Sequence, residues 1–488
     1  MRGFDFSPAT TPEKKKGCVP MSFSNLIVPY AARLDSHVVL TNVPSASIPP
    51  LTAMATYPNP AWVQAERMGR SLIGIPRSLN LWGWMGPSLR LPRGLWTHIQ
   101  MQLGPCPFIE DHRVVFPKID FHWRGQLRPE QRQAVIKALQ SDDGVLVAPP
   151  GAGKTNMALA YIAARRQPAL FLVPTRELAY QALERARQLF DLPAEAFGLL
   201  GDGTECVGTH LTVGIVATLV RRDLPKLSER FGTLVGDESH HVPAQTVRQV
   251  VEAFPARYRL GITATPNRQD GLGPMMLAVM GPVSATLTTK DLVQSERLIL
   301  PQVRQIETQF AYPYTENYHE LMAALIADAD RNALVVAYVT QEARAGHRIL
   351  VLSERIAHVQ TLYQLCREAA PEIQAEFLTG TTPKSRRMAL LDAMRHGDLS
   401  VLFASKIADE GLDLPSLDRI ALATGGRSES RVAQRVGRIM RPAPGKVGAT
   451  VLDFVDWNSP VLAAQAKARY WRVYRPLGAR VTREGVVA

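Results

Sequence analysis

The sequence predicts an α/β protein with two tandem parallel-sheet domains and a smaller accessory domain at the N-terminus. Short, β-branched apolar runs alternate with helical patterns from about residue 126 to 265, and the alternation then repeats further along the chain. Strands that are apolar on both faces and alternate with helices are typical of parallel sheets covered by helices. The first 120 residues differ, because they are rich in proline and hold four of the seven tryptophans, with a fifth close by at Trp123.

The accessory domain is expected over residues 1–120, with some strands of its own and a disordered leader of about 20 residues. We expect most of its tryptophans in a core, with one or two free to stack on bases. The first α/β domain is expected over residues 121–298. Its predicted strands are GVLVA (144–148), ALFLVP (169–174), LTVGIVA (211–217), TLVGDE (233–238) and YRLGITA (258–264), and its predicted helices span 156–166 and 176–190.

The second α/β domain is expected over residues 299–488, with the joint between the domains near 290–300. Its predicted strands are RILVLSE (348–354), AEFLTG (375–380), LSVLFASK (399–406), DRIALAT (418–424) and ATVLDFVD (449–456). Its predicted helices lie near 317–340, 356–369, 383–395 and 429–440.

The charge is unevenly distributed, which suggests a polyanionic partner, most simply nucleic acid. Residues 1–125 hold 13 Lys and Arg against 7 Asp and Glu, and residues 427–488 hold 12 against 4. The chain's formal net charge is +12, so the 301 residues between these flanks carry −2. A basic surface with no polyanion partner is the alternative.

Other compositional features disfavour several classes of protein. The four cysteines lie far apart without a Cys-x-x-Cys pair, which argues against a zinc ribbon or a disulfide framework. No apolar run approaches the roughly 20 residues that span a bilayer, and no signal-peptide core follows the N-terminus. We therefore expect a cytoplasmic protein that is not inserted in a membrane.

A phosphate-binding loop is predicted directly after the first strand of the first domain. APPGAGKT is followed by a helical segment, and its glycines let backbone N–H groups curl around a phosphate at a helix N-terminus. Lys154 can reach the β- and γ-phosphates of ATP, and the Thr155 hydroxyl can hold Mg²⁺. The expected ATP-binding residues of this loop are Pro150, Gly151, Ala152, Gly153, Lys154 and Thr155.

The acidic segment VGDESHHVP (235–243) predicts the catalytic partner of that loop. At the end of a parallel strand, Asp237 is expected to hold Mg²⁺, while Glu238 orients and activates the attacking water. A solvated loop is the alternative, and the phosphate-binding loop argues against it. We expect His240 and His241 to point to different sides of the chain, which disfavours a paired-histidine metal site.

With these motifs in place, the chain resembles superfamily 2 helicases and translocases over roughly residues 120–475, which implies two RecA-like domains. LRPEQRQAV (127–135) resembles the adenine-reading element, PTRELAYQ (174–181) motif Ia, IVATL (215–219) the next strand contact and GITATP (261–266) motif III. The resemblance implies adenine contacts from Arg128 and Gln131, nucleic-acid contacts from Thr175, Arg176 and Thr218, and coupling through His240, Thr263 and Thr265.

The resemblance continues through the second domain. LTGTT (378–382) resembles a strand-contacting segment, FASKIADEGLDLP (403–415) motif V and QRVGRIMR (434–441) motif VI. It implies a strand contact from Thr379, nucleotide contacts from Gly411 and Asp413, and catalytic roles for Gln434, Arg438 and Arg441, the last as arginine finger. Helical spacing alone places 434, 438 and 441 on one face; a solvated basic helix is the alternative.

Departures from other branches narrow the resemblance. Ser239 and His240 replace the last two residues of the Asp-Glu-Ala-Asp box of RNA helicases, and motif VI differs from theirs. The chain is more similar to the DNA-directed branch that includes XPB and UvsW. In XPB an Arg-Glu-Asp element lies at this place, and here Arg268, which the resemblance implies as a nucleic-acid contact, is followed by Gln269 instead of the glutamate.

The predicted function is therefore an ATP- and Mg²⁺-dependent DNA helicase or translocase acting on duplex, branched or single-stranded DNA. Three alternatives remain open at this stage. They are an RNA helicase, a motor subunit of a restriction or defence complex, and a DNA-binding module that nucleotide merely switches. Lys154, Glu238 and Arg441 together argue against the last, since a switch does not require all three.

Overall fold

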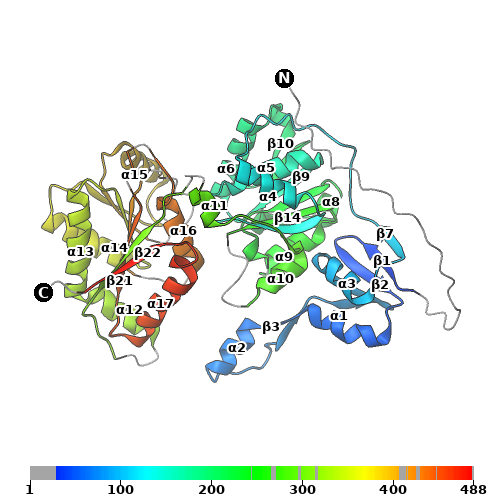
Figure 1. The fold of residues 1–488 in the computed structure, drawn as a ribbon, viewed down its shortest axis with the longest axis horizontal. Helices are drawn as coiled ribbons and strands as arrows, with labels where there is room; N and C mark the ends of the chain where they lie inside the picture. The colour runs from blue at the N-terminus through cyan, green and yellow to red at the C-terminus, as the bar shows by residue number, and fades with distance from the viewer. Residues whose placement is uncertain are drawn as a thin grey trace. The chain divides into compact units, whose positions relative to one another are not determined.

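The computed structural model describes residues 29–485, apart from 243, 265–270, 295–297, 314–316, 406–413, 415, 425–428, 444 and 447. The chain divides into two compact units (Figure 1). The first unit contains residues 1–147 and 155–286, and the second contains residues 287–488 with the loop 148–154. The accessory region therefore belongs to the same unit as the first α/β domain.

The accessory region forms a five-stranded sheet with the strand order β5-β6-β2-β1-β7. Its strands are β1 (Ala31–Leu34), β2 (His37–Thr41), β5 (Gly83–Met85), β6 (Ser88–Pro92) and β7 (Phe108–Asp111). A separate pair, β3 (Thr56–Pro58) with β4 (Ser78–Asn80), is antiparallel. The helices are α1 (Ile48–Met54), α2 (Pro60–Arg67) and α3 (Trp96–Leu103). Trp82 and Trp96 pack against the core, whereas Trp84 is largely exposed.

The central sheet of the first unit has eight strands in the order β11-β10-β12-β9-β13-β14-β8-β15, and only β11 runs antiparallel to its neighbour. Its strands are β8 (Asp143–Val147), β9 (Ala169–Val173), β10 (Phe197–Gly201), β11 (Thr204–Cys206), β12 (Leu211–Ile215), β13 (Thr233–Gly236), β14 (Tyr258–Thr263) and β15 (Val283–Thr286). The five strands predicted for this domain are confirmed. Strands β10, β11 and β15 were not predicted.

Helices pack around this sheet (Figure 1). They are α4 (Pro129–Ala138), α5 (Lys154–Arg165), α6 (Arg176–Leu189), α7 (Val216–Leu219), α8 (Leu224–Ser228), α9 (Gln245–Ala253) and α10 (Gly273–Met280). The two helices predicted for this domain, 156–166 and 176–190, correspond to α5 and α6. Among the described residues no helix combines the length and apolar composition that crossing a bilayer requires.

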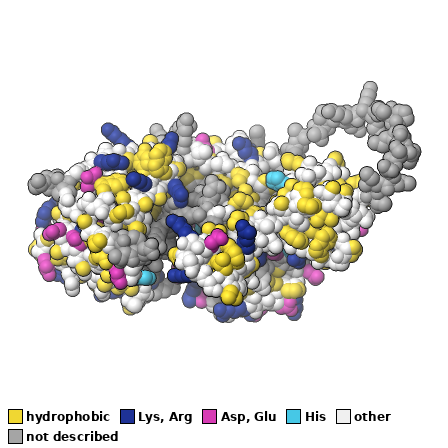
Figure 2. Space-filling model, turned by 90° about the horizontal axis from the view of Figure 1, so that it is seen from below, with side chains coloured by type: hydrophobic (Ala, Val, Ile, Leu, Met, Phe, Trp, Pro, Cys, Tyr) yellow, Lys and Arg dark blue, Asp and Glu magenta, His cyan; other side chains and the backbone are white. Residues whose placement is uncertain are grey.

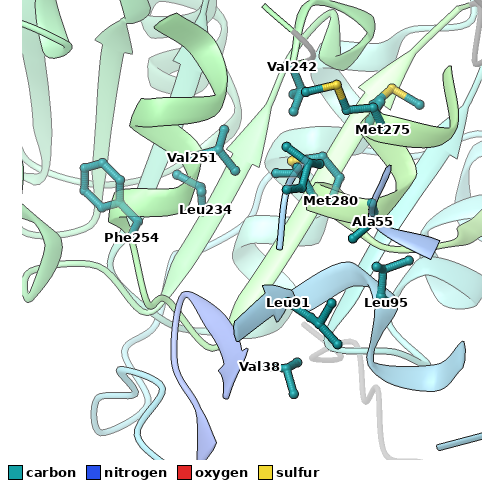
Figure 3. Packing of buried hydrophobic residues seen from close by; sticks show 14 of the residues in the cluster. Val38, Ala55, Leu91, Leu95, Leu234, Val242, Val251, Phe254, Met275 and Met280 are labelled. Atoms are coloured by element: carbon teal, nitrogen blue, oxygen red, sulfur yellow. The ribbon is translucent and has the colours of Figure 1, made fainter. Parts of the chain in front are cut away.

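One apolar core runs through both parts of the first unit. Val38, Leu91 and Leu95 of the accessory region belong to the same buried cluster as Val251 and Met280, from α9 and α10 (Figure 3). Because burial of apolar side chains is the main stabilising contribution to folding, this shared core makes the two parts a single folded body.

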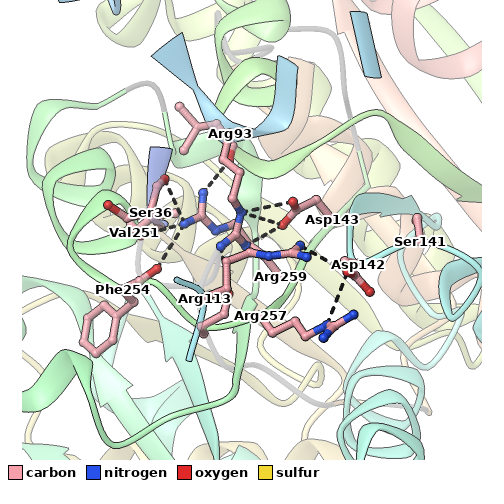
Figure 4. A network of polar contacts seen from close by, with 12 residues as sticks. Ser36, Arg93, Arg113, Ser141, Asp142, Asp143, Val251, Phe254, Arg257 and Arg259 are labelled. Carbon is pink, nitrogen blue, oxygen red and sulfur yellow. Dashed lines mark hydrogen bonds and ion pairs between the residues drawn. The ribbon is translucent and has the colours of Figure 1, made fainter. Parts of the chain in front are cut away.

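A polar network reinforces that junction (Figure 4). The buried guanidinium of Arg93 donates to both carboxylate oxygens of Asp143 at the start of β8, with Nε–O distances of 3.1 and 3.0 Å. It also donates to the main-chain carbonyls of Asp35, at 3.0 Å, and Ala256, at 2.8 Å. One side chain thus ties an accessory loop to β8 and to the segment that leads from α9 into β14.

The second unit is built on a fully parallel seven-stranded sheet in the order β18-β19-β17-β20-β21-β16-β22. Its strands are β16 (Gln302–Glu307), β17 (Ile349–Leu352), β18 (Ala375–Leu378), β19 (Val401–Ala404), β20 (Arg419–Leu422), β21 (Thr450–Val455) and β22 (Arg480–Glu484). The five predicted strands are confirmed, and β16 and β22 extend one edge. The expected fold class, two tandem parallel-sheet domains of the RecA-like kind with an accessory domain, is confirmed.

The helices of the second unit are α11 (Thr289–Gln294), α12 (Tyr318–Ala327), α13 (Ala329–Arg344), α14 (Ile356–Ala369), α15 (Lys384–His396), α16 (Glu429–Ile439) and α17 (Pro460–Arg469), which a π-helical turn (Tyr470–Tyr474) follows. The single helix predicted near 317–340 is wrong, because the chain breaks at Asp328. Asp328 has extended backbone angles, and its carboxylate accepts the N–H of Arg331 at 2.8 Å, which caps α13.

Candidate active site

The loop after β8 has the backbone that a phosphate-binding loop requires. Gly151 and Gly153 have φ angles of +82° and +79°, in the left-handed region that glycine adopts without steric cost. The 12-residue helix α5 begins at Lys154 immediately afterwards. The positive end of the α5 dipole therefore meets a glycine-rich turn, an arrangement suited to an anion such as a phosphate.

The acidic pair ends a strand two places away in the same sheet. β13 and β8 both flank β14, and all three strands are parallel. Their carboxyl ends therefore lie at one edge of the sheet. Asp237 follows β13 directly, and its N–H donates to the carbonyl of Leu172 in β9, at 2.9 Å.

Glu238 has a strained backbone. Its φ of +47° is left-handed, which is uncommon for a residue with a Cβ and costs about 1–3 kcal/mol. The N–H of Glu238 donates to Oδ1 of Asp237 at 2.9 Å, which holds the turn in place. The pair therefore offers one carboxylate that can act as a metal ligand and a second that can act as a base.

His240 connects the acidic pair to the neighbouring strand. Its Nδ1 lies 3.2 Å from Oε2 of Glu238 and 3.1 Å from Oγ1 of Thr263, the last residue of β14. Both His240 and Thr263 are buried. Two of the three predicted coupling residues thus touch each other, and one of them, His240, lies beside the predicted base. The third, Thr265, lies outside the described residues.

The expectation that His240 and His241 point to different sides is wrong. Their ring centroids lie 4.2 Å apart, with an angle of 38° between the ring planes. Both residues belong to a short 3₁₀ helix, Ser239–His241, and this local turn brings the neighbouring rings together. In the described part of the chain, no three His, Cys, Asp or Glu side chains cluster as ligands for a metal ion.

Sequence reasoning missed the support beneath this turn. A Cβ added to Gly261 of β14 would lie 2.8 Å from Oγ of Ser239, so glycine is needed for this close approach. Ser239 is buried, and its hydroxyl donates to the sulfur of Met276 in α10 at 3.7 Å. The signal in the sequence was the glycine within a β-branched strand.

The predicted adenine-reading residues have a structural role in the described chain. The N–H of Arg128 donates to Oε1 of Gln131 at 3.1 Å, in a capping box at the start of α4. Nε of Arg128 also lies 3.1 Å from a carboxylate oxygen of Glu130. Gln131 is buried, so its side chain is held in a single place rather than moving freely in solvent.

The predicted strand contacts of the first unit lie on α6 and α7. Thr175 caps α6, since its Oγ1 accepts the N–H of Leu178 at 3.4 Å. Arg176 is exposed, and its Nε lies 2.7 Å from Asp202, which also accepts the hydroxyl of Tyr180 at 2.6 Å. The sequence analysis did not predict Tyr180 or Asp202, which lies in the turn GLLGDG (198–203). Thr218 lies in α7 and is half-buried.

In the second unit, α16 carries Gln434 and Arg438, and Arg441 follows its end. The Nζ of Lys446 donates to the carbonyl of Arg441 at 2.8 Å, which fixes the backbone at the predicted arginine finger. Burial, with contributions from nearby arginines, lowers the pKa of Lys446 to about 8. The side chain of Gln434 is not described.

Other predicted residues in motifs III and V, Arg268, Gly411 and Asp413, also lie outside the described residues. Thr379 is described and is only 2% exposed, and its hydroxyl lies 3.0 Å from that of the exposed Thr381. Thr381 was missed as a candidate strand contact, because only the three-dimensional turn distinguishes the two threonines.

Comparison with known families agrees with this geometry. A family model described as "Type III restriction enzyme, res subunit" matches residues 124–268, and one described as "Helicase conserved C-terminal domain" matches residues 330–443. Together these matches contain the phosphate-binding loop, the acidic pair and motif VI.

Individual relatives point the same way. A protein of Haloarcula marismortui, provisionally named DNA 3'-5' helicase Rad25, is 31% identical over 338 residues, which are 67% of this chain and 52% of that protein. The DNA 3'-5' translocase XPB2 of Sulfurisphaera tokodaii is 26% identical over 65% of this chain and 79% of its own length. The chain spans about half the length of the Haloarcula relative and of a similar Halobacterium salinarum protein.

A solved structure shows the fold. The ATP-dependent Type ISP restriction-modification enzyme LlaBIII, bound to DNA, superposes with a TM-score of 0.57 at 16% identity. The match covers 78% of this chain and 33% of that enzyme. At this level of identity the likeness concerns the fold alone.

Proposed function

We propose that this chain, which belongs to superfamily 2 of the helicases and translocases, is an ATP-dependent motor that moves on or remodels duplex or branched DNA. The observation that carries the proposal is the strained Glu238, held 3.2 Å from His240, which in turn touches Thr263. A base tied in this way to the end of a neighbouring strand is suited to coupling hydrolysis with movement of the nucleic-acid-binding segments.

In this proposal Glu238 accepts the proton of the water that attacks the γ-phosphate. The backbone of Glu238 is left-handed, and one of its carboxylate oxygens lies 3.2 Å from Nδ1 of His240. Lys154, at the first turn of α5, faces the phosphates together with the N–H groups of the glycine-rich loop. Arg441 is proposed to supply the second cation in the transition state.

The residues present fit ATP with a divalent cation. The left-handed glycines at the start of a three-turn helix provide the anion site, while the Thr155 hydroxyl and the Asp237 carboxylate are oxygen donors of the kind that Mg²⁺ prefers. These two side chains would hold the ion, which when bound neutralises charge on the phosphates.

DNA is preferred over RNA as the partner. The two relatives above are named as DNA-directed motors, and Ser239 and His240 depart from the RNA-helicase box. The predicted contacts of Thr175, Arg176 and Thr218 are with the strand backbone, so binding should be independent of sequence and weakened by salt.

The test is steady-state ATP hydrolysis at fixed salt, with no nucleic acid, single-stranded DNA, duplex DNA, a fork or RNA. We expect DNA, above all the fork, to stimulate hydrolysis, and Glu238→Gln to abolish it. Glu229→Gln is the matched control, since Glu229 is exposed and lies outside the site. Preferential stimulation by RNA, or slow hydrolysis indifferent to every substrate, would overturn the proposal.

A second candidate is the motor subunit of a restriction or defence complex, and the match of residues 124–268 to a restriction-enzyme subunit family favours it. Such a motor moves along duplex without separating strands. Displacement of a triplex-forming third strand from duplex DNA, without unwinding of any fork, would favour this candidate. Unwinding of a fork would favour a helicase.

A further inference from the structure

A well-defined loop in the accessory region exposes apolar side chains that the ATPase site does not use. It spans residues 68–77, between α2 and β4. Ile73 is 92% exposed and Met68 is 53% exposed. An isoleucine left in water forgoes about 1.5–3 kcal/mol of burial free energy. Apolar side chains that stand exposed together, rimmed by polar residues, mark candidate binding surfaces.

The base of the loop is closed by a buried asparagine. Asn59 is the N-cap of α2, where its Oδ1 accepts the N–H of Ala61 at 3.0 Å. Its Nδ2 donates to the carbonyl of Pro76 at 2.7 Å, and its own N–H donates to the carbonyl of Arg77 at 3.1 Å. These bonds join the C-terminal end of the loop to the start of α2, beside the β3–β4 pair, so α2 and the loop project from one base.

The tip of the loop is a tight turn. The N–H of Ile75 donates to the carbonyl of Leu72 at 3.1 Å, and Gly74 has a φ of +79°. A positive φ at the third residue is the signature of a type II turn, in which the second residue, here Ile73, occupies an outer corner. Nothing lies within 4 Å of where a Gly74 Cβ would be, so the corner is surrounded by open space.

Arginines flank the apolar tip. Arg67 ends α2, the N–H of Arg70 donates to the carbonyl of Ala65 at 2.9 Å, and Arg77 closes the loop, so all three belong to one small body. All three are exposed, and no described residue forms an ion pair with them. The view from the side on which α2 lies shows basic atoms beside apolar atoms (Figure 2).

The wider accessory sequence has the same charge bias. Between Asp35 and Glu110 there are five arginines and one acidic residue, Glu66. Arg93 is one of the five and is already paired with Asp143. The surface around the loop is therefore cationic, which favours a polyanion over an apolar protein surface.

We propose that the loop 68–77 is a second DNA contact, in which Arg67, Arg70 and Arg77 bind phosphates of a duplex while Ile73 inserts at a base step from the minor groove. Arginines combined with an apolar wedge are how proteins bind and kink the minor groove. The choice of DNA as the polyanion rests on the proposed function.

The loop is also mechanically connected to the ATPase site. Its base continues through β4 into the accessory sheet, which shares a core with α9 and α10 and is tied to β8 by Arg93. A duplex held at the loop is therefore attached to the same folded body that carries Asp237 and Glu238. For the same reason, deletion of the whole accessory region would expose the core and could not test its role in DNA binding.

The experiment is duplex binding by the full chain without ATP, measured by fluorescence anisotropy across a salt series. We expect Ile73→Ser to weaken duplex binding about tenfold, the loss of one good base-step contact of about 1.4 kcal/mol, with the salt slope unchanged. The triple variant Arg67→Ser, Arg70→Ser, Arg77→Ser should lower the slope of log K against log salt by about 3. A duplex with 2-aminopurine at successive steps should brighten on binding the wild type but not Ile73→Ser.

Met101→Ser is the matched control, because Met101 is 77% exposed on α3 of the same region and lies outside the loop. It should bind DNA as the wild type does, and all variants should keep wild-type ATP hydrolysis in the absence of DNA. Unchanged affinity and salt slope in both loop variants would overturn the proposal. If the loop variants lost binding to phosphatidylserine vesicles but kept duplex binding, the proposal would be overturned in favour of a membrane surface.

These outcomes are separate from those of the ATPase test. A chain whose hydrolysis ignores DNA, but whose duplex binding depends on Ile73 and the three arginines, would refute the motor and retain the loop contact. A DNA-stimulated ATPase with unaffected loop variants would do the reverse.

Discussion

Each of the two units buries an arginine. In the first unit main-chain carbonyls surround the buried cation, whereas in the second unit a carboxylate is paired with it. Arg259 of β14 donates to main-chain carbonyls, those of Val279 at 2.8 Å and Phe254 at 3.1 Å, and burial lowers its pKa, with a further contribution from Arg93. Arg469 of α17 is paired with the fully buried carboxylate of Asp453, at 2.8 and 3.3 Å.

For Arg469, burial by itself lowers the pKa, but the Asp453 carboxylate outweighs this effect and holds the pKa above its usual value. The second unit thus carries its compensation within itself. In the first unit the Asp143 carboxylate raises the pKa of Arg259, but it is already bound by Arg93 from the accessory region. The α/β part of the first unit therefore depends on the accessory region for its electrostatics as well as its packing.

The largest expected effect is that of Asp453→Ala. It leaves Arg469 buried without a carboxylate and removes the acceptor of the Tyr474 hydroxyl, 2.9 Å away. Removal of one partner of a buried ion pair costs about 3–5 kcal/mol, here in the second unit alone. Urea unfolding followed by tryptophan fluorescence would measure it.

The control for that variant is Asp392→Ala, which removes an exposed ion pair with Arg395 on α15. Its cost should stay below about 1 kcal/mol, because exposed pairs are solvated. Equal losses in the two variants would show that Asp453 does not compensate a buried charge.

Asp143→Ala should have the next largest effect, about 2–4 kcal/mol, near the lower end for a buried pair because Asp143 is partly exposed. Arg93 keeps its bonds to two carbonyls, so it stays in place as an uncompensated cation beside Arg259. Hydrogen exchange should increase in β1, β2 and β8 together. The double variant Arg93→Met, Asp143→Ala should recover part of the loss, and strict additivity would contradict the pairing.

Acid should weaken the second unit through His358. Burial, with Arg331 nearby, lowers the pKa of this ring to about 3, and Ser353 and Asn332 hold it neutral, each at 2.9 Å. The unfolded ring binds its proton near pH 6.5. The unfolded state therefore holds more protons between pH 6.5 and 3, and stability falls as the pH drops through that window.

At about 1.4 kcal/mol per pKa unit, lowering the pH from 6.5 to 5 should cost about 2 kcal/mol. Urea midpoints at the two pH values, compared between wild type and His358→Gln, would measure this slope. The exposed His396 provides the control, since His396→Gln should keep the wild-type slope. If the stability of His358→Gln fell with pH as steeply as that of the wild type, His358 would not be the group responsible.

The smallest effect is expected from Arg259→Met. The variant loses hydrogen bonds to carbonyls, which costs stability, but it also removes a buried cation without a carboxylate of its own. These contributions oppose each other, so the net change should be about 1 kcal/mol or less. Thermal unfolding would test this. The matched variant is Arg469→Met, which leaves the Asp453 carboxylate buried without its cation and should lower the free energy of unfolding far more.

Local sequence patterns predicted most of the fold and the order of the site motifs. The strands that follow apolar β-branched runs, the left-handed Gly151 and Gly153, and the acidic residues after β13 all depend on neighbouring residues only. Strands β16 (QVRQIE) and β22 (RVTRE) were missed because polar and charged residues outnumber apolar ones in both. The break at Asp328 was missed because the helical pattern continues across it.

By itself, then, the sequence determined two parallel-sheet domains, a phosphate-binding loop and an acidic pair, because backbone conformation and amphipathic periodicity are local properties. Only the tertiary structure decided which distant residues meet. It paired Arg93 with Asp143, buried Thr379 while Thr381 stayed exposed, brought the rings of His240 and His241 together and left Ile73 exposed. Such contacts are set by chain closure and packing over the whole molecule, and no periodicity in the sequence encodes them.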